Sequence, residues 1–148
     1  MTATVRTREL GKQIFEAQIN AAGLRCSESS PGRRAHYRVS RSGDNGTGLS
    51  LDLKLTTSSN ETFSLYKADK ELALLVYVWS VRDSNKSAVY ALTYDEAYQI
   101  MEANKHTNTP SWQQEKGGFS ITHSGTKVKN ALLRFRMTPE KWRERFRS

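Results

Sequence analysis

A carboxylate and an ammonium group stand two residues apart in the segment Leu51-Asp-Leu-Lys-Leu55. Leucines alternate with polar residues here, which predicts a β-strand, and a spacing of two places Asp52 and Lys54 on one face of it. A carboxylate suits a hard cation such as Mg²⁺, which favours oxygen ligands and phosphate substrates. A neighbouring lysine can position a water molecule or stabilise charge on a phosphate. The pair fits phosphodiester chemistry, but a solvated strand face can carry the same triplet.

Two strands must position this pair. Apolar and polar residues alternate over residues 35–40 and again over 49–56, which predicts two strands. The glycine-rich stretch 42–48 between them predicts a long hairpin loop, and it lacks the Gly-Lys-Ser/Thr ending of a phosphate-binding loop.

The hairpin predicts which side chains face each other. With the turn centred near Asp44, His36 lies opposite Asp52, and Arg38 lies opposite Ser50. Both polar sets then share one face of the sheet.

The other elements follow from apolar spacing. Helical spacing from Leu10 to Ala21 predicts a helix closed by Gly23, and a polar loop follows at 29–32. The rest of the chain predicts strands over 72–81 and 87–92, a helix capped by Thr93–Glu96, a polar loop over 104–118, a strand over 119–122 and helices from Val128 and from Thr138. This order predicts one α/β domain over residues 1–148.

Composition limits the function classes. The lone Cys26 excludes an internal disulfide and a cysteine-based zinc site. The longest apolar stretch, 72–79, is too short to span a bilayer, and the N-terminus lacks a secretory pattern. We therefore expect a cytoplasmic protein with no membrane partner.

The positive charge is concentrated at the two ends of the sequence. The formal net charge is +8, and residues 126–148 hold eight Lys or Arg against two Glu. Residues 55–125 hold six Lys or Arg against eight Asp or Glu. Such asymmetry suits phosphate binding, because neutralised phosphates release counterions, although a charge that only confers solubility is the alternative.

These residues together resemble the PD-(D/E)XK, or restriction-endonuclease-like, superfamily of nucleases. The family pattern is a helix with a glutamate, a strand with an aspartate, and a strand with Asp/Glu-x-Lys followed by small hydroxyl residues. Gly11-Lys-Gln-Ile-Phe-Glu16 matches the helix, and Leu51-Asp-Leu-Lys-Leu-Thr-Thr-Ser-Ser59 matches the Asp-x-Lys strand. The resemblance covers residues 8–103 as a nuclease-like core and leaves 104–148 as a basic C-terminal strand and helices. It implies a central mixed sheet flanked by helices.

The resemblance also implies an active site and reveals one departure from the family. Glu16, Asp52 and Lys54 would be catalytic, with Mg²⁺ or Mn²⁺ held by Asp52, Glu16 and His36. His36 stands where the family has its first aspartate, and a neutral imidazole binds Mg²⁺ poorly. Either the site is degenerate, in which case no cofactor is needed, or Asp44, Glu16 or another acid substitutes.

Basic residues near the predicted site and at the C-terminus form the expected nucleic-acid contacts. They are Arg33, Arg34, Arg38, Arg41, Lys127, Lys129, Arg134 and Arg136. We expect DNA rather than RNA as the partner, and a homodimer remains open because many proteins of this fold pair.

Three hypotheses follow. The first is a metal-dependent endonuclease that cuts DNA, and the second is a nucleic-acid-binding protein on the same fold with a decayed site. The third is a non-catalytic basic subunit of a larger nucleoprotein assembly.

Overall fold

Three antiparallel strands form a meander that carries the Asp52–Lys54 pair. The computed structural model describes residues 3–30, 35–41, 50–114 and 117–146. It contains β1 (Leu24–Ser30), β2 (Ala35–Arg41) and β3 (Ser50–Thr57) as neighbours in that order. The strands predicted at 35–40 and 49–56 are confirmed, whereas β1 has no counterpart in the prediction and overlaps the start of the expected loop at 29–32. β1 is an edge strand, and Leu24 is the only buried residue among those of its side chains that the structure describes, which fits its mainly polar sequence.

Two further strands complete a mixed five-stranded sheet. β5 (Leu74–Trp79) pairs with β3 in parallel, and β6 (Ala88–Leu92) pairs with β5 antiparallel, giving the order β1-β2-β3-β5-β6. A parallel pair requires a crossover connection. Here the crossover contains β4 (Phe63–Tyr66) and the short 3-10 helix η1 (Lys67–Glu71). Both β5 and β6 are buried along their whole length, as expected for strands covered on both faces.

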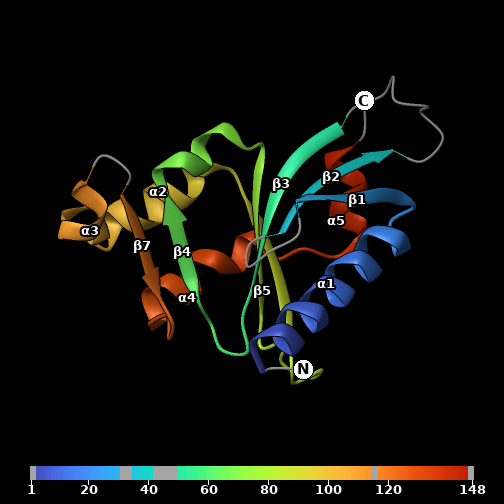
Figure 1. Cartoon of the computed structure of the whole chain (residues 1–148), viewed down its shortest axis with the longest axis horizontal. Coiled ribbons are helices and arrows are strands. Elements are labelled where there is room, and N and C mark those ends of the chain that lie inside the picture. The colour runs from blue at the N-terminus through green and yellow to red at the C-terminus, as the bar shows by residue number, and fades with distance from the viewer. Residues whose placement is uncertain (1–2, 31–34, 42–49, 115–116, 147–148) are drawn as a thin grey trace.

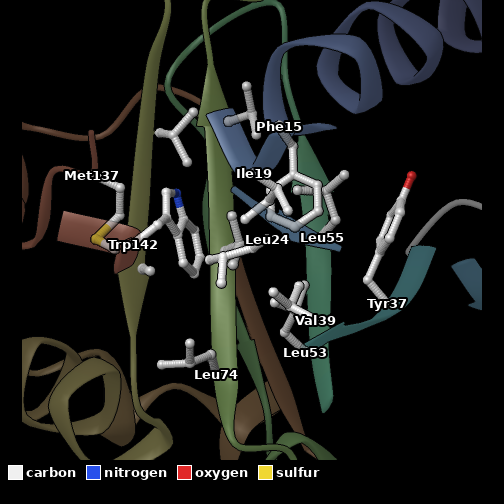
Figure 2. Close-up of a cluster of buried hydrophobic side chains, with 14 of the residues drawn as sticks. Phe15, Ile19, Leu24, Tyr37, Val39, Leu53, Leu55, Leu74, Met137 and Trp142 are labelled. Atoms are coloured by element: carbon white, nitrogen blue, oxygen red, sulfur yellow. The ribbon is translucent and has the colours of Figure 1, made fainter. Parts of the chain in front are cut away.

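One face of the sheet is covered by α1 (Ala3–Ala21) and α5 (Pro139–Arg145) (Figure 1). Phe15 and Ile19 of α1 pack between Trp142 of α5 and Leu55 of β3 (Figure 2). The ring of Phe15 meets that of Trp142 edge-on at 5.9 Å between centroids. The predicted N-terminal helix is confirmed and begins earlier than its apolar spacing indicated.

The opposite face is covered by a second layer. A two-stranded sheet of β4 and β7 (Gly118–Ile121) lies there with α2 (Tyr94–Ala103) and α4 (Thr126–Leu132) (Figure 1). The expected loop 104–118 contains two short helices, η2 (His106–Asn108) and α3 (Pro110–Gln113), and Trp112 of α3 is buried in this second core. The capping box predicted at the start of α2 is confirmed, because Thr93 and Glu96 each accept a backbone N–H of the other.

The C-terminal segment passes from one layer to the other along the outer edge of β6. It consists of α4, η3 (Leu133–Phe135) and α5, and between the helices Arg136 forms a bridge with Tyr90 of β6. The N–H of Met137 donates to the carbonyl of Val89 over 2.7 Å. Val128 belongs to the second core and Trp142 to the first. The described part of residues 104–148 is therefore integrated into both cores.

The prediction of a single α/β domain with a mixed sheet and flanking helices is confirmed. Across the described ranges, every helix is too short or too polar to span a bilayer.

Candidate functional site

The polar residues of β2 and β3 lie on the face opposite to α1. Tyr37, Leu53 and Leu55 point into the core beneath α1, so the residues that alternate with them face the other way. The observed register pairs His36 with Lys54 and Arg38 with Asp52. The predicted register is wrong by two residues. Because a shift of two preserves the alternation, the predicted sharing of one face is still correct.

Asp52 is held by an arginine of the neighbouring strand. The Arg38 Nε donates to Asp52 Oδ1 over 2.9 Å, and a second guanidinium nitrogen lies 3.4 Å from Oδ2. Both side chains are more than half exposed. The hydrogen bond from Arg38 lowers the pKa of the Asp52 carboxyl. Asp52 is thus a charged carboxylate whose oxygens already accept from a cation.

Lys54 is buried in a second ion pair. Its Nζ lies 2.8 Å from Oδ1 of Asp69, and the two side chains are 5% and 9% exposed. The other carboxylate oxygen of Asp69 accepts the backbone N–H of Tyr66, and the Lys54 ammonium sits 4.8 Å from the centre of the Tyr66 ring. Hydrogen bonds and an aromatic face therefore compensate this buried charge.

The ion pairs Arg38–Asp52 and Lys54–Asp69 together form what we call the charged centre. Asp69 is the residue of this centre that the sequence prediction missed. It lies within Lys67-Ala-Asp-Lys-Glu71, a polar run with no motif. Its position follows from topology, because the crossover between the parallel strands β3 and β5 brings η1 against the polar face of β3. The sequence could have indicated Asp69 only if β3 had been predicted to pair in parallel with the strand at 74–79, because a parallel pair requires a crossover, and this crossover contains Asp69.

Glu16 lies away from this centre. It is on α1, and its charge acts on Cys26 and Tyr37: burial first, and then Glu16, raises the pKa of the Cys26 thiol to about 11. The described residues contain no group of three or more His, Cys, Asp or Glu side chains able to hold a metal ion. The structure therefore does not gather Glu16, His36 and Asp52 around one point, and Asp44 lies outside the described residues.

The surface around His36 forms two adjoining hollows. One has a volume of about 430 Å³ and contains Arg38 and Asp52, and the other has about 680 Å³ and contains Lys54 and Asp69. They meet at His36 and Leu72, which line both. Their walls combine four Lys or Arg side chains with three carboxylates, so the charge is close to balanced. Such walls can hold a polar ligand but provide little net attraction for a polyanion.

The predicted nucleic-acid contacts fall on separate surfaces. Arg33 and Arg34 lie outside the described residues, and Arg38 and Arg41 belong to β2. The C-terminal cations lie beyond β6, at the outer edge of the sheet. From β3 to that segment is three strand spacings, roughly 14 Å. The four predicted C-terminal contacts are all exposed: Lys127, Lys129, Arg134 and Arg136.

Local contacts orient two of these C-terminal cations. Lys129 reaches back to Glu61 at 2.8 Å, and the guanidinium of Arg134 lies 4.7 Å from the centre of the Phe135 ring. Comparison of the chain with protein-family models, with characterised proteins and with solved structures found no match. The residues themselves must therefore support any functional assignment.

Proposed function

We propose that this protein binds nucleic acid through an exposed basic surface formed by residues 126–146. This C-terminal basic surface carries the proposal: its seven Lys and Arg side chains are all exposed, against two Glu. Within the described residues its one ion pair joins Lys129 to Glu61. Cations arranged in this way can neutralise a run of phosphates and release their counterions.

The shape of this surface supports a polyanionic partner. α4 belongs to one layer and α5 to the other, and Arg136 lies between them on the edge of β6. The cations therefore extend around the sheet edge, where a long phosphate backbone can reach several of them. We propose DNA as the partner, in line with the nuclease resemblance.

The element order supports a restriction-endonuclease-like arrangement. Within residues 3–103, a helix precedes three antiparallel strands, the third of which carries Asp52 and Lys54. The apolar strand β5, the returning strand β6 and the capped helix α2 then follow as the resemblance implies. Binding on a nuclease-derived fold is thus the coherent interpretation.

The charge pairing of the centre supports binding without cleavage. Asp52 is occupied by Arg38, and Lys54 is occupied by Asp69. A lysine that stabilises a scissile phosphate must reach it, whereas the Lys54 side chain is 5% exposed. A Mg²⁺ or Mn²⁺ ion at Asp52 would also have to displace the guanidinium of Arg38.

Metal-dependent endonuclease activity is the second candidate. It is favoured by one observation: His36, Asp52, Lys54 and Asp69 all lie on one side of the sheet within two adjoining hollows. Asp69 supplies an acid that the family pattern does not contain. In this alternative, Asp52 and Asp69 would turn away from their cations and hold Mg²⁺ or Mn²⁺, and Lys54 would be free to stabilise charge on the phosphate.

A single assay separates these functions. Labelled single- and double-stranded DNA and RNA are incubated with the protein in EDTA, Mg²⁺ or Mn²⁺ and run on native and denaturing gels. The proposal expects shifted bands and intact strands in every metal. Cleavage that is abolished by Lys54→Ala, in a variant whose circular dichroism spectrum shows that it is still folded, would establish the endonuclease instead. No shift at low salt would leave the hypothesis of a non-catalytic basic subunit. His36→Asp tests whether restoring a carboxylate restores cleavage.

The salt dependence of binding locates the surface. The binding constant K falls as the salt concentration rises, and replacing one cation that contacts a phosphate makes the slope of log K against log salt concentration shallower by about one. We expect this for Lys127→Gln and Arg143→Gln. Lys86→Gln is the matched control, because Lys86 is exposed in the turn between β5 and β6 and outside this surface. Equal slopes in all three variants would refute the assignment to residues 126–146.

A further inference from the structure

A third hollow, at the end of β3 between α1 and the β4–β7 layer, is lined only by polar residues. It has a volume of about 730 Å³ and lies where residues 56–60 leave β3, against β4 and β7. Thr7, Arg8 and Arg82 complete its wall. We call it the hydroxyl groove, because ten of its thirteen lining residues carry a hydroxyl group. Two arginines and Asn60 make up the rest.

The hydroxyl groove differs in charge from the hollows around His36. No carboxylate occurs among its thirteen lining residues, all of which belong to the described chain. Asp52, Asp69 and Glu71, by contrast, line the other two hollows. A cation would meet two arginines here, whereas an anion would meet hydroxyl and amide donors together with two positive charges. The lining therefore selects anions.

The floor of the groove is fixed by backbone hydrogen bonds to the end of β5. The N–H groups of Ser80 and Val81 donate to the carbonyls of Asn60 and Ser58, over 2.9 Å and 3.1 Å. Ser80 adopts a left-handed conformation, with φ of 53°, which a serine holds only when its surroundings compensate the strain. The Ser58 hydroxyl lies 2.9 Å from the Thr62 hydroxyl and accepts the N–H of Asn60. The segment from Ser58 to Thr62 is therefore held in place before any ligand arrives.

A close helix–strand approach fixes the cationic side of the groove. A β-carbon at Gly11 would overlap the side chain of Thr57, so glycine allows α1 to contact the end of β3 there. Arg8 lies one helical turn before Gly11. Arg82 follows β5 and donates to the Thr7 hydroxyl over 3.1 Å and 3.2 Å. The two arginines thus come from separate elements and converge on one groove.

We propose that the hydroxyl groove binds a phosphate group of a nucleotide unit. Its volume suits a ligand of that size. Arg8 and Arg82 would balance the phosphate charge, and the hydroxyls of residues 56–62 would donate to its oxygens. The groove adjoins the hollow that contains Lys54, because Tyr66 lines both. That the nucleotide belongs to a nucleic-acid strand rests on the proposed function, since a free nucleotide offers the same chemistry.

The test places a carboxylate in the groove. Ser59 is exposed, so Ser59→Asp adds a negative charge to the wall without filling the core. Ser111→Asp is the matched control, because Ser111 is exposed on α3 and does not line the groove. The probes are AMP, sodium phosphate and a short oligothymidylate. Binding is followed by fluorescence anisotropy and by the amide NMR signals of Asn60, Thr62 and Arg8.

We expect the oligothymidylate to bind Ser59→Asp about tenfold more weakly than the wild-type protein, because the added carboxylate repels the phosphate. Its affinity for Ser111→Asp should stay within about twofold of the wild-type affinity. The three amide signals should move in the wild-type protein. If the strand binds but Ser59→Asp does not weaken it, the groove inference is overturned and the proposed function stands. If AMP or phosphate binds with the same Ser59→Asp sensitivity and the strand does not, the groove stands and the proposed function fails. No binding of any probe overturns both.

Discussion

The ammonium group of Lys54 and the carboxylate of Asp69 form a 2.8 Å ion pair that is almost completely buried. The pair joins the centre of β3 to the crossover that precedes β5. In a protein interior, losing one partner leaves the other as an uncompensated charge. The same contact that holds η1 in place therefore removes Lys54 from solvent.

Asp69→Asn should destabilise the protein by about 3–5 kcal/mol, because the Lys54 charge then lacks its partner. The asparagine still offers an oxygen to the Tyr66 N–H, so the loss reports the charge itself. The measurement is urea unfolding followed by circular dichroism. Adding Lys54→Met should recover part of the loss. The exposed Glu71→Gln is the control and should change the unfolding free energy by less than about 0.5 kcal/mol. A cost below about 1 kcal/mol for Asp69→Asn would show that the pair is not buried in solution.

Arg38→Gln should raise the pKa of Asp52 toward its ordinary value, because the hydrogen bond from Arg38 lowers it. A lowered Asp52 pKa stabilises the folded protein at a pH above the pKa that Asp52 has in the unfolded chain. This contribution is lost as the pH falls through the pKa of the folded state. Both side chains are largely exposed, so the change in stability is small. Carboxyl ¹³C NMR titration measures the pKa directly. Arg25→Gln is the matched control and should leave the Asp52 pKa unchanged. An unchanged Asp52 pKa in Arg38→Gln would refute the ion pair between Arg38 and Asp52.

Gly11→Ala should destabilise the protein by about 1–3 kcal/mol, because the added methyl group overlaps Thr57 and forces α1 away from β3. Gly125 provides a control, since a β-carbon there meets nothing within 4 Å. Gly125→Ala should stay within about 0.5 kcal/mol of the wild type. Thermal unfolding of both variants checks the difference. If both variants unfold alike, the close approach of α1 to β3 is wrong.

Cys26 should react slowly with a disulfide reagent at pH 8. Burial, with the charge of Glu16, raises its pKa to about 11, so its thiolate fraction is about two orders of magnitude below that of an ordinary cysteine. A more basic thiolate is a better nucleophile, which offsets about one order. The net expectation is a rate about tenfold lower than in urea, rising with pH up to about 11. Stopped-flow absorbance gives the rates. A plateau near pH 9 in the folded protein would contradict the assigned environment.

The sequence specified the alternating strands, the apolar strands and the capped helix well. Leucines at 51, 53 and 55 gave both the position of β3 and its buried face. The edge strand β1 escaped detection because it has one strand neighbour and few buried side chains. β4 escaped because four residues, Phe63–Tyr66, are too few to show a period.

The centre itself was only partly predictable. Asp52 and Lys54 share a face because of their spacing, and local spacing is visible in a sequence. Their partners come from elsewhere: Arg38 depends on the hairpin register, and Asp69 depends on how the chain crosses from β3 to β5. The hydroxyl groove likewise combines residues of α1, β3, β4 and β7, and the longest stretch of its lining that is continuous in sequence is 56–60. Serines and threonines scattered over those elements carry no local signal.

The hydrogen bonds between α1 and the C-terminal segment have a consequence for how this chain acquires its structure. Gln18 accepts from Trp142 Nε1 and donates to the carbonyl of Met137, contacts that span 124 and 119 residues of chain. Closing such long loops costs entropy before the contacts reward it, which slows folding. During synthesis, α1 emerges from the ribosome long before Met137 and Trp142 exist. The apolar face of α1 therefore stays incompletely covered for most of translation, and this nascent stage is the one most exposed to aggregation.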